Sequence, residues 1–205
     1  MKNLVAIVFL LCLVCTIAPA QSPPHMQAGV TVQYGHYNLT DSNTGISATD
    51  DRSNIAIGAF FDAIYLRANI EYQSAISGTL AITGLGSADY PSGFSVSFIN
   101  LKALGKYPFQ LGTTTLWPAI GVRYSYPLSV KIGGVDLLAD PNSDFADFYV
   151  CFGGGLDFAT GPVVIGFSAL YDYSLTPSQT KSTLFPGEKV SGFDLEIALN
   201  VGFAL

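Results

Sequence analysis

Few residues of this 205-residue chain have the chemistry of a catalytic site. Its two histidines are His25 and His36, and a hydrolase or transferase needs an acid–base group held beside a nucleophile. His36 is followed by Tyr37 and Asn38, so no serine stands two residues after it. No other pattern in the chain indicates a catalytic pair or a cofactor-binding loop. We therefore expect no catalytic residues, no enzymatic activity and no cofactor.

One acidic stretch, residues 140–147, invites a calcium interpretation. Its carboxylates are Asp140, Asp144 and Asp147. A calcium loop of the EF-hand type places oxygen ligands at alternate positions and needs a glycine at its sharp turn. The stretch has neither the spacing nor the glycine. A solvated acidic loop is the better interpretation, and we expect no metal site.

Two of the three cysteines, Cys12 and Cys15, lie in an N-terminal segment that predicts export. The N-terminal residues combine Lys2, an apolar run from Leu4 to Ile17, and the small-x-small sequence Ala18–Pro19–Ala20. We interpret residues 1–20 as a signal peptide and residues 21–205 as a single mature domain. The alternative, a lipoprotein signal acylated at Cys12 or Cys15, would need a small residue directly before the cysteine. The mature chain keeps one cysteine and forms no internal disulfide.

Composition and charge argue against nucleic-acid binding and against a membrane-spanning helix. Charged residues are 12% of the chain, where soluble domains have roughly 25%, yet hydrophobic residues reach 49%. The net charge of −6 gives no basic patch, so we expect no nucleic acid partner. Beyond the first twenty residues, no uncharged apolar run approaches the 18 residues of a spanning helix. The chain is therefore very apolar without a membrane helix.

The charged residues that do occur stand at alternate positions of strand-like segments. In the closing segment GFDLEIALNVGFAL, Asp194 and Glu196 alternate with large apolar residues such as Leu195 and Ile197. Period-two alternation is typical of a β-strand with two different faces. Eight segments share it, at residues 28–37, 53–61, 64–73, 93–105, 116–126, 148–158, 163–173 and 192–205.

The spacers between these segments alternate between short and long. The short ones lie around Asp62, from Gly105 to Thr114, and around Thr160. The long polar ones are residues 38–52, 74–92, 127–147 and 174–191. This order predicts an all-β fold, an eight-stranded antiparallel up-and-down transmembrane β-barrel, with both termini on the side of the short turns.

The fourth segment, residues 93–105, breaks the alternation. Phe94, Val96 and Phe98 share a parity with Asn100 and Lys102. A β-bulge near Phe98 would resolve the conflict, because one extra residue reverses the face of every residue beyond it. The sequence alone does not fix the register of this strand.

Charge and size decide which face of the barrel points inward. The alternation alone also fits a soluble barrel with its apolar face inside. The other face, however, mixes charged residues with Gly, Ala and Ser, which suits the narrow interior of eight strands. We therefore predict a polar network in the lumen, in which Arg123 pairs with Glu71 or Glu196. The network consists of Arg67, Glu71, Arg123, Asp172, Asp194 and Glu196.

The apolar face then points to lipid, and its aromatic residues gather towards the segment ends. Tyr and Trp are enriched at membrane interfaces, where they form aromatic belts. The residues expected in these belts are Tyr34, Phe61, Tyr72, Tyr124, Tyr126, Phe148, Phe158, Tyr171, Tyr173 and Phe203.

With this pattern, the mature chain resembles the small eight-stranded outer-membrane barrels, of the OmpX, OmpW and OmpA transmembrane-domain type. The stretch LGKYPFQLGTTTLWPAIGVRY also looks like the mid-barrel turn of such proteins. The resemblance implies a bacterial outer-membrane location with periplasmic termini. It also implies that the last strand is an assembly signal read by the barrel-insertion machinery, carried here by Leu199, Val201, Phe203 and Leu205. The chain departs from the family at its end, because Leu205 stands where the family has Phe or Trp.

These observations predict a monomer embedded in outer-membrane lipid that presents its four long loops to the exterior. Its function would be structural or adhesive, or would support envelope integrity, with any extracellular ligand bound through residues 38–52, 74–92, 127–147 and 174–191. The alternative is transport, as a narrow channel or a conduit for small or hydrophobic solutes. Some barrels of this family are lipid-modifying enzymes with a His and a Ser near the outer leaflet, but His36 lacks the serine.

Overall fold

The computed structural model describes residues 26–43, 46–82, 85–89, 95–132, 135–136, 146–175 and 189–205. The expected signal peptide, residues 1–20, and the first part of the acidic stretch, residues 140–145, lie outside the described residues. No helix in the described part of the chain is long and apolar enough to span a membrane.

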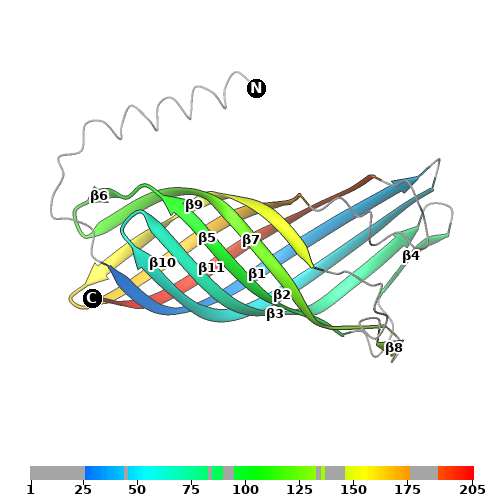
Figure 1. Cartoon of the computed structure of the whole chain (residues 1–205), viewed down its shortest axis with the longest axis horizontal. Coiled ribbons are helices and arrows are strands. Elements are labelled where there is room, and N and C mark those ends of the chain that lie inside the picture. The colour runs from blue at the N-terminus through cyan, green and yellow to red at the C-terminus, as the bar shows by residue number, and fades with distance from the viewer. Residues whose placement is uncertain are drawn as a thin grey trace, which may run out of the picture.

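Eight long strands form the wall of a closed barrel (Figure 1). Every neighbouring pair is antiparallel, and the pairings β1–β2 and β1–β11 close the sheet on itself. The strands are β1 (Gln27–Asn43), β2 (Ile46–Ala63), β3 (Leu66–Ile82), β5 (Ser95–Lys106), β7 (Thr114–Ile132), β9 (Asp147–Thr160), β10 (Val163–Ser174) and β11 (Lys189–Ala204). The predicted fold class, an all-β antiparallel up-and-down barrel of eight strands, is confirmed.

Three short strands pair with the wall at its two ends. β4 (Gly86–Asp89) extends β3, and β8 (Val135–Asp136) extends β7. β6 (Phe109–Leu111) pairs with the start of β7 at the opposite end of the barrel. In Figure 1, β6 lies at the left-hand end, while β4 and β8 lie at the right-hand end.

The end of the barrel that carries β6 is built from short connections and also holds the C-terminus (Figure 1). The backbone N–H of Leu205 donates to the carbonyl of Met26 at 2.7 Å, so the first and last strands start and finish together. Gly161 and Gly112 occupy turns with φ of +62° and +65°, a conformation that glycine adopts without steric cost. We call this the short-turn end and the opposite one the long-loop end.

The turn between β2 and β3 is unusually tight. The N–H of Tyr65 donates to the carbonyl of Ala63 at 2.6 Å, and the φ of Ile64 is +59°. These are the features of a γ-turn with a positive central φ, which is rare and strained for a β-branched residue. The turn therefore stores backbone strain in an otherwise regular wall.

At the long-loop end, the predicted loops were too long, because the strands extend into them. β1 and β2 pair continuously to Asn43 and Ile46, within the predicted loop 38–52. β3 continues to Ile82, β7 continues to Ile132, and β11 already begins at Lys189. In β1 and β2 the reason is that the sequences NLTDSN and SATDDR are mostly polar, so the alternation that marks a strand is lost. In β3 and β7 the alternation continues, for example at Leu128, Val130 and Ile132, and the loops were begun too early. Residues 176–188 of the fourth loop lie outside the described residues.

The two faces of the wall differ as the alternation predicts. Large apolar side chains on the outward face are exposed, for example Val30 at 57%, Ile57 at 61% and Ile197 at 58%. Their neighbours on the inward face are buried and polar, such as Thr31 at 1% and Glu196 at 4%. The assignment of the apolar face to the exterior is confirmed.

The irregularity predicted near Phe98 is present. The register between β5 and β7 shifts between Ser97 and Phe98. Ser97 faces Ser129 and Phe98 faces Pro127, so the extra residue is Leu128 of β7 and not a residue of β5. The face of β5 is therefore not reversed as predicted: Val96, before the shift, is buried like Asn100 and Lys102, which have the same parity.

Inward glycines let the strands come close together. A Cβ on Gly58 would lie 2.1 Å from the backbone oxygen of Ile70, and one on Gly121 would lie 2.1 Å from that of Ala103. No side chain fits at such a distance. These glycines, with the small inward residues between them, leave the lumen volume to a few large polar side chains.

Candidate functional site

The charged residues of the lumen form two layers, one nearer each end of the barrel. The first, the short-turn layer, consists of Asp62, Arg67, Lys106 and Asp157. Arg67 Nη2 lies 2.8 Å from Asp62 Oδ2 and 3.5 Å from Asp157 Oδ2, and Lys106 Nζ lies 2.6 Å from Asp62 Oδ2. Gln27 Nε2 donates to both carboxylates, at 3.2 and 3.3 Å. Two cations thus match two carboxylates.

Aromatic rings pack against the cations of this layer. The guanidinium of Arg67 lies 4.4 Å from the ring centre of Trp117 and 4.8 Å from that of Phe60, and Lys106 Nζ lies 5.3 Å from Trp117. Trp117 is fully buried and packs with Leu104, Cys151 and neighbouring apolar side chains. Cation–π contacts of this kind stabilise a desolvated charge. The layer is therefore a filled and charge-balanced plug.

The second, the long-loop layer, is built around Arg123 and Lys102. Arg123 Nη1 lies 2.8 Å from Asp172 Oδ2, 3.0 Å from Asp194 Oδ2 and 2.5 Å from Glu196 Oε1. The guanidinium also lies 3.9 Å from the ring centre of Tyr149. One cation from β7 thus joins carboxylates of β10 and β11, on the opposite part of the wall.

Lys102 completes the long-loop layer. Its Nζ contacts Glu196 Oε2, lies 3.0 Å from Glu71 Oε2 and donates to Gln33 Oε1 at 3.0 Å. Of the two partners expected for Arg123, the structure places Glu196 in contact and gives Glu71 to Lys102. A buried ion pair costs desolvation free energy, and several hydrogen bonds per charge are needed to offset it.

All six residues of the expected lumen network point inward and are buried, but they divide between the two layers. Arg67 belongs to the short-turn layer and the other five to the long-loop layer. Sequence reasoning missed Asp62, Lys102 and Lys106. Asp62 has the inward parity of Phe60 and was assigned to a turn because strand β2 was ended two residues too early. The two lysines share the inward parity of Val96, and they were missed because the face of this strand was left open.

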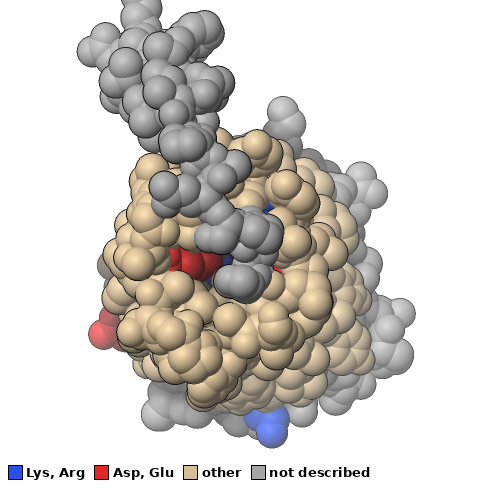
Figure 2. Space-filling model, turned by 90° about the vertical axis from the view of Figure 1, so that its left-hand side faces the viewer, with Lys and Arg blue, Asp and Glu red and all other residues tan. Residues whose placement is uncertain are grey.

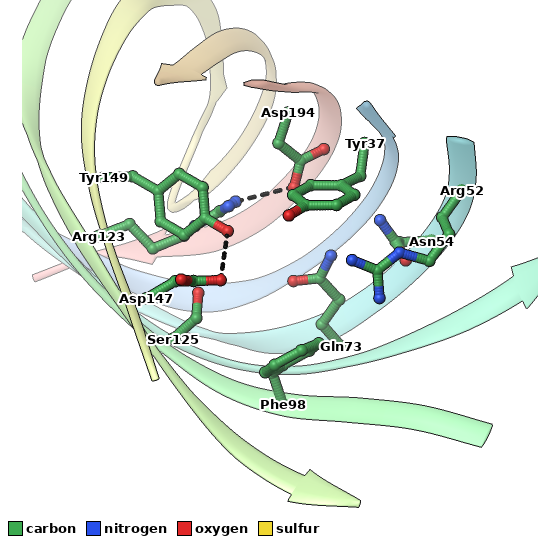
Figure 3. A pocket seen from close by; sticks show the side chains of 10 residues that line it. All are labelled: Tyr37, Arg52, Asn54, Gln73, Phe98, Arg123, Ser125, Asp147, Tyr149 and Asp194. Atoms are coloured by element: carbon green, nitrogen blue, oxygen red, sulfur yellow. Dashed lines mark hydrogen bonds and ion pairs between the residues drawn. The ribbon is translucent and has the colours of Figure 1, made fainter. Parts of the chain in front are cut away.

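A small cavity lies on the long-loop side of Arg123 (Figure 3). It measures about 20 Å³, which is room for a group the size of one water molecule. The lining side chains come from seven strands: Tyr37, Arg52, Asn54, Gln73, Phe98, Arg123, Ser125, Asp147, Tyr149 and Asp194. Asp147 and Tyr149 are joined by a hydrogen bond of 3.1 Å from the tyrosine hydroxyl.

The view onto the short-turn end shows the same separation of charge from the exterior (Figure 2). Acidic and basic atoms appear in the middle of a ring of uncharged residues. The charge of the barrel wall is thus concentrated inside it.

His36 lies on the outer face towards the long-loop end. Its imidazole is 42% exposed, and its Nε2 lies 3.5 Å from Asp51 Oδ2. Ser53 stands opposite it in the register but shares a 2.9 Å hydrogen bond with the hydroxyl of Tyr34. His36 therefore has a carboxylate partner, and the nearby serine is hydrogen-bonded to a tyrosine.

The four residues expected to carry the assembly signal lie along the outward face of β11 and at its end. Leu199, Val201, Phe203 and Leu205 are 42%, 37%, 58% and 67% exposed. They form a continuous apolar row down to the short-turn end, opposite the inward polar row of the same strand.

No protein-family model and no curated protein sequence matches this chain. Among solved structures, it is similar to the neisserial surface protein A, with 19% identity over 86% of this chain and 99% of that one and a TM-score of 0.47. OprG from Pseudomonas aeruginosa gives 14% identity over 90% and 100%, with a TM-score of 0.43. The N-terminal β-barrel domain of OprF from the same organism gives 8% over 84% and 97%, with a TM-score of 0.40. The fold itself follows from the strand pairing: the chain is a closed, antiparallel, eight-stranded β-barrel.

Proposed function

We propose that this protein is an integral β-barrel of the bacterial outer membrane with a closed lumen, and that it acts through its long-loop end in adhesion or envelope integrity. The observation that carries the proposal is the pair of salt-bridged layers across the lumen. A barrel that is filled in this way offers its surfaces, rather than its interior, for function.

The exterior of the barrel supports the membrane location. Along β11, the outward residues Leu195 to Phe203 are all large, apolar and exposed. A charge on the lipid face near the middle of the bilayer costs about 2–4 kcal/mol, so a lipid-facing wall has to exclude charged residues. A water-facing barrel would carry Lys and Glu on this surface instead. Aromatic residues such as Phe61 and Tyr124, at 44% and 39% exposed, suit the interfacial belts.

Closure of the lumen argues against the transport alternative. Arg67 and Arg123 reach across the interior from β3 and β7 and are each 1% exposed. Lys102 and Lys106 fill the same interior from β5. The cavity at the long-loop end is bounded on its inner side by Arg123, so in the described lumen it gives no passage past the long-loop layer. Opening a path would require breaking several buried ion pairs at once.

The long-loop end supplies the surface for a partner. β1 and β2 extend as a paired hairpin to residues 43 and 46, with the polar sequences NLTDSN and SATDDR. β3 and β4 form a second extension of the same wall. Regular strands hold these polar residues in a fixed arrangement, which suits recognition of an extracellular ligand. With the periplasmic side at the short turns, β11 would serve as the assembly signal for the insertion machinery.

An enzymatic role is not proposed. A hydrolase of the outer face would need a serine activated by the imidazole of His36. The contact of Ser53 with Tyr34 and that of His36 with Asp51 favour a polar interfacial patch instead.

Conductance in planar lipid bilayers tests the closed lumen. We expect the purified barrel to give no regular current steps, because the two layers exclude a continuous water column. The double variant Arg123→Ala/Lys102→Ala removes both cations of the long-loop layer and serves as a comparison. We expect this variant to give current more often than the unmodified protein. Reproducible discrete steps in the unmodified protein would overturn the structural role and support transport.

A further inference from the structure

The two layers of the lumen differ in their charge balance. In the short-turn layer, Arg67 and Lys106 match Asp62 and Asp157. In the long-loop layer, Lys102 and Arg123 face four buried carboxylates: Glu71, Asp172, Asp194 and Glu196. Two negative charges of this layer therefore have no cation within it. Burying unmatched charge is costly, and the cost falls if a cation binds nearby.

The cavity on the long-loop side of Arg123 adjoins this excess charge. Asp194, which belongs to the layer, also lines the cavity, and Asp147 adds a further carboxylate that is 6% exposed (Figure 3). Both arginines of the lining already have anionic partners. Arg123 contacts three carboxylates, and Arg52 lies 3.0 Å from Asp50.

Hydrogen-bond acceptors in the cavity are left over. Ser125 is 4% exposed, lines the cavity, and its Oγ has no hydrogen-bond partner among the described residues. Asp194 is fully buried, and its Oδ1 likewise has none in the described part of the chain. A buried polar atom without a partner is uncommon in native proteins. The Nε of Arg123, which also lines the cavity, is an unpartnered donor in the described part of the chain. The lining thus leaves two acceptors and one donor unsatisfied, and what the layer lacks is positive charge.

We propose that this cavity, lined by Ser125, Asp147 and Asp194, binds the primary ammonium group of a small organic amine that enters from the long-loop end. A primary ammonium carries one positive charge and three donors in a volume close to that of water. A quaternary ammonium has no N–H to donate to the unpartnered acceptors. A metal ion fits less well, since the described residues contain no cluster of three or more His, Cys, Asp or Glu side chains in ligand geometry.

The inference goes beyond the proposed function, because it needs only the folded lumen and holds whether or not the barrel conducts. NMR titration of the full barrel in lipid nanodiscs tests it, with the ring signals of Tyr37 and Tyr149 as local reporters. The ligands are methylammonium, ethanolamine, choline and calcium chloride at constant ionic strength. We expect saturable shifts with methylammonium and ethanolamine, with a Kd on the order of 1 mM. Choline should bind at least about tenfold more weakly, because it offers the carboxylates no N–H donor.

Two variants and one control place the site. Ser125→Ala removes an acceptor and should weaken methylammonium binding about tenfold, and Asp147→Asn should weaken it at least as much. Ser168→Ala is the matched control: Ser168 is a buried lumen serine that does not line the cavity and accepts from Asn200 Nδ2 at 3.3 Å. It should leave binding unchanged.

Several results would overturn the proposal. These are the absence of any saturable shift, equal binding of choline, stronger binding of calcium than of methylammonium, or unchanged binding in both Ser125→Ala and Asp147→Asn. If one of the two variants does not fold, the other decides. A failure here leaves the conductance result untouched, so the two proposals fail separately.

Discussion

At the scale of single residues, the lumen depends on a few cations that each serve several carboxylates. Arg123 is the most heavily engaged, since Asp172, Asp194 and Glu196 all lie within 3.0 Å of its Nη1. Its side chain is 1% exposed, so no solvent compensates the carboxylates if it is removed. The stability of the long-loop layer should therefore be very sensitive to this position.

Replacing Arg123 by Met should lower the free energy of unfolding by about 3–5 kcal/mol, because the buried carboxylates of Asp172 and Asp194 lose their cation and Glu196 keeps only Lys102. The measurement is urea-induced unfolding of the barrel in lipid vesicles. Arg123→Lys keeps the charge and should lower the free energy of unfolding by less. A lysine ammonium lacks the planar, forked guanidinium of arginine, so it should not contact all three carboxylates. A loss below about 1 kcal/mol for Arg123→Met would mean that the layer contributes little to the fold.

The inward position of the expected lumen residues followed from the alternation, because a β-strand has a period of two. Which residue pairs with which did not follow, since pairing depends on the registers of eight strands at once. Lys102 shows the limit. Its parity places it with Val96 and Asn100 on the inward face, but without a fixed register for this strand the lysine could not be assigned to the lumen. Glu71 then has a nearer cation than Arg123.

At the scale of elements, the strands combine an apolar outward row with a polar inward row, and their ends differ. The pattern located all eight strands in the belt region. It left the long-loop portions of β1, β2, β3 and β7 out of the strands. Those of β1 and β2 are mostly polar and carry no alternation, whereas those of β3 and β7 keep the alternation and were missed. Turn chemistry was equally hard to foresee, as the turn at Ile64 contains neither Gly nor Asn.

The strain of that turn gives a prediction for the β2–β3 element. A positive φ costs an ordinary residue about 1–2 kcal/mol, and asparagine tolerates it better than a β-branched residue. Ile64→Asn should therefore raise the free energy of unfolding by about 1 kcal/mol. Urea unfolding in vesicles provides the test, with Ile64→Val as the control that keeps the β-branch and changes nothing. Destabilisation by the asparagine would show that the turn is not strained at this residue.

The last strand carries a second prediction at this scale. If its outward row is the assembly signal, an aromatic residue at the end should improve recognition by the insertion machinery. Leu205→Phe should then increase the folded fraction in the outer membrane, and Phe203→Asn should decrease it. Heat-modifiability of membrane fractions on gels gives the folded fraction. Equal folded fractions for the parent chain and both variants would argue that this row has no role in assembly.

At the scale of the whole molecule, the barrel is polar inside and apolar outside, the reverse of a soluble protein. The interior is held by ion pairs in two layers, and the exterior gains stability only if hydrocarbon covers it. The strands of the long-loop end continue the same wall beyond this belt. In the proposed membrane setting, one sheet would serve both as the membrane anchor and as the exposed surface. This arrangement explains a chain with few charges overall that buries eleven of the charged side chains in its described part.

The most direct test of this account compares two isoleucines with the same exposure. Ile197 lies in the middle of the outward row of β11 and Ile76 lies on the extension of β3, and each is 58% exposed. In lipid vesicles, Ile197→Lys should lower the free energy of unfolding by about 2–4 kcal/mol, whereas Ile76→Lys should change it by less than about 0.5 kcal/mol. Equal small effects at the two positions would contradict a barrel wall embedded in lipid.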